Sequence, residues 1–143
     1  MIKKKITEDL LEELKQENTD IKEYITENSN SFIQVNLREF WNGLFEKSGK
    51  TKADVVNNSD VSYIYFYEIL QGKKVPTKDK IVRLILAMGL ELEDCQKALK
   101  YCNQSLLYPR IKRDSYIIYA IEHKISVYKT QEMLIEAGEP ELK

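Results

Sequence analysis

The chain of 143 residues has a formal net charge of −1 and is 43% hydrophobic and 31% charged. This length and composition fit a small globular protein with its own core, and they exclude a disordered or fibrous chain. No apolar run approaches the roughly 18 residues that a membrane span requires, and the start of the chain lacks the apolar centre of a signal peptide. We therefore expect a cytoplasmic protein.

The residues that most often carry chemistry are few in this chain. Cys95 and Cys102 fall in one predicted helix, about 10 Å apart along its axis, which is too far for a disulfide. We expect both to be buried, reduced thiols. The single histidine, His123, has no neighbouring pattern of a catalytic triad or zinc site, and we expect it at the surface or half-buried. The sequence also lacks a phosphate-binding loop and a dinucleotide fingerprint, so we expect no enzyme, cofactor or metal site.

The first 33 residues form an acidic segment, with five Lys against eight Asp or Glu. Apolar residues at 10–14 and 21–25 recur at helical spacing, and Asp20 precedes the second group as an N-cap residue would. We expect two short amphipathic helices. The segment could pack on the core, pair with a second subunit or form a disordered tail, and we favour packing on the core.

Residues 37–71 predict three helices. Thr51 and Asp54 have the spacing of a capping box that opens a helix to about Asn58, and a connector at 59–61 leads to a helix over 62–71. Residues 63–67 alternate as a strand would, but no partner strand is present, so we expect a helix there as well. The first of the three helices follows an apolar stripe at helical spacing, made of Leu37, Phe40, Trp41, Leu44 and Phe45.

Four further helices are expected over 77–88, 91–103, 111–123 and 126–137. A weak repeat with an offset of 35 residues relates the two pairs. We interpret it as two helical hairpins stacked on each other, with chance similarity of helical patterns as the alternative. The corresponding positions are Asp79 with Asp114, Leu90 with Ile125, Leu92 with Val127, Leu99 with Leu134, Leu107 with Leu142, and Asn103 with Gly138.

Residues 34–105, about half of the chain, resemble the Cro/lambda-repressor-like family of helix-turn-helix domains, also called the xenobiotic-response-element type. Val61 and Ser62 match the pair that opens the family's recognition helix, and Gly72 follows at the expected distance. Residues 72–76, Gly-Lys-Lys-Val-Pro, resemble the loop after that helix. Further matching positions are Leu37, Phe40 to Gly49, Thr51, Leu84, Ala87, Gly89, Leu90 and Leu92.

Four positions depart from the family's pattern. Asp60 replaces the usual glycine of the turn, so the turn depends on aspartate's tolerance of left-handed geometry. Val56 replaces a small alanine where the two helices cross, which moves them apart or rotates them. Lys52 replaces a polar residue at the head of the second helix, where it can still hold a phosphate, and Leu70 replaces an acid before the loop.

The expected recognition helix is unusual for DNA readout. Helical geometry turns Val61, Tyr65, Phe66 and Ile69 toward the core, and it turns Tyr63, Ile64, Tyr67 and Gln71 outward. Only Gln71 has the paired donor and acceptor that read base edges well. Tyrosine hydroxyls can reach phosphates and Ile64 can touch a thymine methyl group, but a Tyr-Ile-Tyr surface is also typical of protein interfaces.

The resemblance implies a transcriptional regulator that binds double-stranded DNA, commonly as a two-fold homodimer. Residues 71–83 hold a cation cluster, made of Lys73, Lys74, Lys78, Lys80 and Arg83 with Asp79 as its one acid. Its four lysines are expected to supply phosphate contacts, with a solvated loop and first helical turn as the alternative. The alternative function is a protein-interaction adaptor that uses a degenerate helix-turn-helix scaffold. The expected DNA-binding residues are Lys52, Ser62, Tyr63, Ile64, Tyr67, Gln71, Lys73, Lys74 and Lys78.

We thus expect an all-α protein in three parts: an N-terminal helical segment at 1–33, a helix-turn-helix domain at 34–105 and a C-terminal helical hairpin at 106–143. Tyr116, Tyr119 and Leu134 in that hairpin are a candidate dimer surface. Arg110, Lys112 and Arg113 form a second basic group, which could extend the DNA footprint, bind an acidic partner or simply be a solvated helix start.

Overall fold

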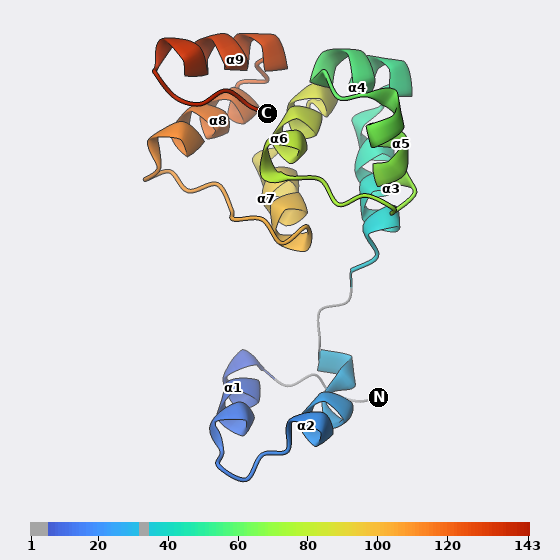
Figure 1. The fold of residues 1–143 in the computed structure, drawn as a ribbon, viewed down its shortest axis with the longest axis vertical. Coiled ribbons are helices and arrows are strands. Elements are labelled where there is room, and N and C mark those ends of the chain that lie inside the picture. The colour runs from blue at the N-terminus through green and yellow to red at the C-terminus, as the bar shows by residue number, and fades with distance from the viewer. Residues whose placement is uncertain (1–5, 32–34) are drawn as a thin grey trace. The chain divides into compact units, whose positions relative to one another are not determined.

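A computed structural model of the protein describes residues 6–31 and 35–143, and the ordered elements within them are all helical (Figure 1). The chain divides into two compact units, Met1–Gln34 and Val35–Lys143. No helix in the described residues has the length and apolar character needed to cross a membrane.

The first unit is a pair of short helices, α1 (Thr7–Lys15) and α2 (Ile21–Glu27), followed by a 3-10 turn, η1 (Ser29–Ser31). Asp20 caps α2 as expected, because its carboxylate accepts from the backbone N–H groups of Lys22 and Glu23. The buried amide of Asn28 donates to the Glu13 carboxylate on α1 at 2.8 Å. This hydrogen bond holds the two helices together.

The second unit contains α3 (Leu37–Ser48), α4 (Lys52–Ser59), α5 (Tyr63–Leu70), α6 (Lys78–Met88), α7 (Leu92–Tyr101), α8 (Lys112–Glu122) and α9 (Val127–Glu136). In Figure 1, α6 and α7 lie between α3–α5 on one side and α8–α9 on the other. Residues Ile81 to Met88 of α6 are all buried. Helix α6 is therefore the central helix of this unit's core.

Aromatic side chains join the surrounding helices. The Phe45 ring of α3 meets the Phe66 ring of α5 edge to face, with 5.5 Å between centroids. The Phe40 ring of α3 meets Tyr101 of α7 in the same way at 5.0 Å. Cys95 and Cys102 are buried and unbridged, as expected. The segment 63–67 is helical despite its strand-like alternation, because Phe66 and Ile69 enter the core one helical turn apart.

The α6–α7 and α8–α9 pairs are equivalent hairpins at an offset of 35 residues. In the first, the Gln96 side chain donates to the Leu107 carbonyl and accepts from the Leu107 N–H, both at 2.9 Å. In the second, Gln131 makes the same two bonds to Leu142, at 2.8 and 2.7 Å. Each glutamine fastens the segment that follows its own hairpin. The predicted repeat is thus a structural one.

The contacts between the two hairpins are reciprocal. The Arg113 guanidinium of the second hairpin meets the Asp79 carboxylate of the first at 3.0 Å, and Lys78 of the first meets Asp114 of the second at 3.6 Å. Since Lys78 corresponds to Arg113 and Asp79 to Asp114, each hairpin contacts the other with the same residues. That reciprocity defines a two-fold relation between the stacked hairpins.

Two expectations about the C-terminal hairpin need correction. Leu134 is fully buried in the core, so it lies on no dimer surface. Arg113 does not belong to an open basic group: it also donates to the carbonyls of Pro140 and Glu141, and its side chain is 17% exposed. Both errors arise because a helical pattern gives the buried stripe only approximately and gives no information about distant partners.

Candidate nucleic-acid interface

Helices α4 and α5 are joined by a tight turn that the sequence predicts well. Thr51 and Asp54 form both hydrogen bonds of a capping box at the start of α4. Asp60 ends α4 with φ 56° and ψ 35°, the left-handed conformation expected of the residue that replaces glycine there. The Ser62 hydroxyl accepts from the Tyr65 N–H and caps α5. Ser62 therefore has a structural role at the position expected to face DNA.

The outer side of α5 is formed by large exposed side chains. Tyr63, Ile64 and Tyr67 are 54%, 70% and 45% exposed, whereas Val61, Phe66 and Ile69 are buried. The Tyr63 and Tyr67 rings stack nearly parallel, with 6.5 Å between centroids and 10° between planes. The sequence predicted this orientation for Tyr63, Ile64, Tyr67, Val61, Phe66 and Ile69, whereas Tyr65, expected toward the core, is only half-buried, and Gln71, expected outward, is partly buried.

Cations lie on one flank of this surface. The Lys52 ammonium, at the start of α4, lies 5.9 Å from the centre of the Tyr67 ring. Lys52, Tyr67 and Gln71 also line one shallow depression together with Arg38 of α3. The sequence analysis missed Arg38. Its signal was Gly72, because a Cβ at Gly72 would lie 3.1 Å from the Cβ of Arg38, so only glycine lets the loop pass this close to α3.

The expected cation cluster at 71–83 separates into two groups. Lys73 and Lys74 are exposed, and the Lys74 and Lys80 ammonium groups lie 5.4 and 5.9 Å from the centre of the Tyr65 ring. Lys78 is held elsewhere: its ammonium donates to Ser105 and pairs with Asp114, and its side chain is 19% exposed. Of these four lysines, only Lys73 and Lys74 are exposed.

Arg83 is also not one of the exposed cations of the expected cluster. Its guanidinium is buried and donates to the backbone carbonyls of Ser59, Asp60 and Leu142. It therefore stabilises the turn between α4 and α5 instead of meeting solvent.

Acidic side chains reduce the positive charge of this surface. Glu39 lines the same depression as Lys52 and Tyr67, and Glu68 is half-buried on α5. The Asp54 carboxylate is occupied by the capping box. The described surface thus combines a Tyr-Ile-Tyr centre with cations at its margin, and it is not uniformly basic.

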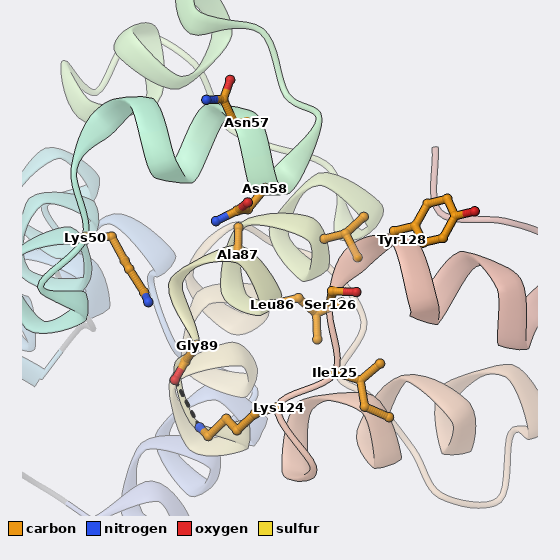
Figure 2. A pocket seen from close by; sticks show the side chains of 11 residues that line it. Lys50, Asn57, Asn58, Leu86, Ala87, Gly89, Lys124, Ile125, Ser126 and Tyr128 are labelled. Atoms are coloured by element: carbon orange, nitrogen blue, oxygen red, sulfur yellow. Dashed lines mark hydrogen bonds between the residues drawn. The ribbon is translucent and has the colours of Figure 1, made fainter.

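A second concave region, of about 580 Å³, lies between the end of α4, the end of α6 and the start of α9 (Figure 2). Lys50, Asn57 and Tyr128 contribute to its lining. The Lys124 ammonium at its rim donates to the Gly89 carbonyl at 3.0 Å, so it is already committed to a structural contact. The lining contains no carboxylate, imidazole or thiol.

His123 is exposed and lies against the Tyr119 ring, with 4.1 Å between centroids. Among the described residues no group of three His, Cys, Asp or Glu side chains is placed to hold a metal ion. Comparison of the chain with protein-family models, with curated proteins and with solved structures finds no match.

Proposed function

We propose that the second unit is a Cro/lambda-repressor-like helix-turn-helix domain that binds double-stranded DNA and regulates transcription, with α5 as the recognition helix. The observation that carries the proposal is the exposed outer side of α5 with Lys52, at the start of α4, beside the Tyr67 ring; the exposed Lys73 and Lys74 follow this helix in the chain. Two short helices joined at a left-handed residue, the second with an open outer side, are what this mode of binding requires.

The side chains suggest how DNA would be held. Arg38, Lys52, Lys73 and Lys74 would neutralise backbone phosphates, which supplies most of the affinity and little of the specificity. Ile64 offers an apolar contact to a thymine methyl group and Gln71 a paired donor and acceptor. With so few base-reading groups, discrimination between sequences would rest largely on DNA shape. A homodimer would place two such surfaces on half-sites about one helical turn apart.

The proposal is tested by charge reversal on the cation margin. Lys52→Glu combined with Lys73→Glu and Lys74→Glu should abolish binding to a fluorescent mixed-sequence duplex, as measured by anisotropy. All three positions are exposed, and an acid in the first turn of α4 favours that helix, so the fold should be retained. The control is Lys97→Glu with Lys100→Glu on α7, which alters exposed lysines outside this margin. Equal effects of the two sets would contradict the proposal.

A protein-interaction adaptor is the second candidate, and one specific observation favours it. Residues 62–71 contain no Lys or Arg, and the exposed centre of α5 is a tyrosine-rich surface of the kind enriched at protein interfaces. In that case, Tyr63→Ala with Tyr67→Ala should remove binding to a protein partner, while the charge reversals above leave it unchanged.

A further inference from the structure

The two equivalent hairpins differ in what covers their outer faces. On the first hairpin, α3 packs along α7: Phe40 meets Tyr101 at 5.0 Å between ring centroids, and the Lys47 ammonium contacts the Asp94 carboxylate at 3.0 Å. On the same hairpin, Ile81, Leu84 and Ala98 are completely buried.

The second hairpin has the corresponding face without the cover. At an offset of 35 residues, Tyr116, Tyr119 and Met133 of the second hairpin correspond to Ile81, Leu84 and Ala98 of the first. With Ser115, these three side chains line an open, largely apolar groove of about 300 Å³ on α8 and α9, which we call the α8–α9 groove. Tyr119 is 51% exposed, whereas its counterpart Leu84 is fully buried.

The charge at the edge of the groove is opposite to the charge at the corresponding position of the first hairpin. Lys129 stands where the first hairpin has Asp94, the residue that binds Lys47 of α3. A helix lying on the second hairpin as α3 lies on the first would therefore meet a cation where α3 meets an anion. Such a helix would be held there by an acidic residue.

We propose that the α8–α9 groove binds an amphipathic helix of a partner protein, which presents an apolar or aromatic anchor and, two turns further on, an Asp or Glu opposite Lys129. The spacing follows from Phe40 and Lys47, the α3 residues that contact Tyr101 and Asp94 of α7, whose places on α9 are taken by Glu136 and Lys129. Helices bind apolar grooves in this manner through residues on one face.

A second copy of the chain is a poorer occupant. The helix that fits such a groove is α3, and the Trp41 side chain of α3 is fully buried within its own unit. A second copy could supply α3 only by unfolding its own core. The groove lies on α8 and α9 and includes no residue of α5, so the proposal does not depend on DNA binding.

The probe is a synthetic peptide of residues 36–49 carrying Lys47→Glu, titrated into the isotopically labelled full chain and followed by NMR. Backbone signals around Tyr116, Tyr119 and Met133 should shift saturably. The same peptide with the native Lys47 should bind about fivefold more weakly, since an attraction at an exposed lysine becomes a repulsion. Lys129→Glu in the protein should reverse this preference.

Two variants locate the contact. Tyr119→Ala should abolish the shifts, and Tyr128→Ala, a 71% exposed residue of α9 outside the groove lining, should leave them unchanged. Shifts confined to α5, equal affinity of the two peptides or no saturable binding would overturn the proposal. Concentration-dependent shifts of the groove signals without peptide would also overturn it, because they would assign the groove to a second copy.

Discussion

The Arg83 guanidinium donates a hydrogen bond to the backbone carbonyl of Leu142 at 2.6 Å, across 59 residues of sequence. The same guanidinium donates to the carbonyls of Ser59 and Asp60, at 3.3 and 3.4 Å, in the turn before α5. One buried side chain thus connects the end of the second hairpin with the turn that orients the proposed recognition helix.

Replacing Arg83 should destabilise the protein strongly. Arg83→Leu leaves the carbonyls of Ser59 and Leu142 buried without this donor, and we expect a loss of about 2–4 kcal/mol in the free energy of unfolding. Urea unfolding followed by circular dichroism measures it. Lys97→Ala, which removes an exposed ion pair with Glu93 on α7, should change the same quantity by less than about 0.5 kcal/mol. Similar costs for both would show that the buried contacts contribute little.

Replacing Gly72 by alanine should destabilise the protein more than the same replacement at Gly49, although the two glycines have similar backbone conformations. Gly72 (φ 75°) and Gly49 (φ 67°) are both left-handed, but only at Gly72 does an added Cβ approach another atom, the Arg38 Cβ at 3.1 Å. Gly49→Ala should cost about 1 kcal/mol from the backbone conformation, and Gly72→Ala should cost more. Thermal unfolding of the two variants compares them directly. A smaller cost at Gly72 would mean that α3 and the loop separate freely.

The two-fold relation predicts matched effects in the two hairpins. Gln96→Ala and Gln131→Ala each remove two hydrogen bonds to one backbone residue, and each should cost about 1–3 kcal/mol. Because the sites share no partner, the double variant should show the sum of the two costs. If Gln131→Ala had a negligible effect on the free energy of unfolding while Gln96→Ala did not, the hydrogen bonds of Gln131 to Leu142 would not stabilise the C-terminal segment, and the predicted match between the hairpins would be wrong.

The thiol of Cys95 should be unreactive in the folded protein. Desolvation by burial raises its pKa from 9.0 to about 12, with the nearby Lys78 ammonium opposing the rise. A disulfide reagent at pH 8 should therefore label Cys95 only after unfolding. Because the folded pKa exceeds the unfolded one, the resulting stability is complete below about pH 9 and is lost between about pH 9 and pH 12, at about 1.4 kcal/mol per pH unit. Cys95→Ala should unfold with a shallower alkaline pH dependence.

Local signals in the sequence were sufficient for most of the helices, but not for α5, because residues 63–67 alternate as a strand would and were assigned to a helix only for want of a partner strand. Thr51 with Asp54 gave the start of α4, because a capping box depends on residues a few positions apart, and the end expected at about Asn58 lies one residue before the observed Ser59. The repeat was detectable for the same reason, since a hairpin contains its own caps and its own apolar stripe.

The roles of individual cations could not be predicted in this way. Lys74 and Lys78 look alike in the sequence, yet Lys78 is fixed by Ser105 and Asp114, which are distant along the chain. Arg38 was overlooked because nothing near it in the sequence is basic, and only the fold brings it beside Lys52. Surface charge becomes interpretable once the partners of each side chain are known.

The central claim, that the α5 surface binds DNA through phosphate contacts, is tested most directly by titrating a mixed-sequence duplex at a series of salt concentrations. If four cations each neutralise one phosphate, a plot of log binding constant against log salt concentration should fall linearly with a slope of about −3.6. Binding that does not change with salt, or no binding at low salt, would contradict the claim.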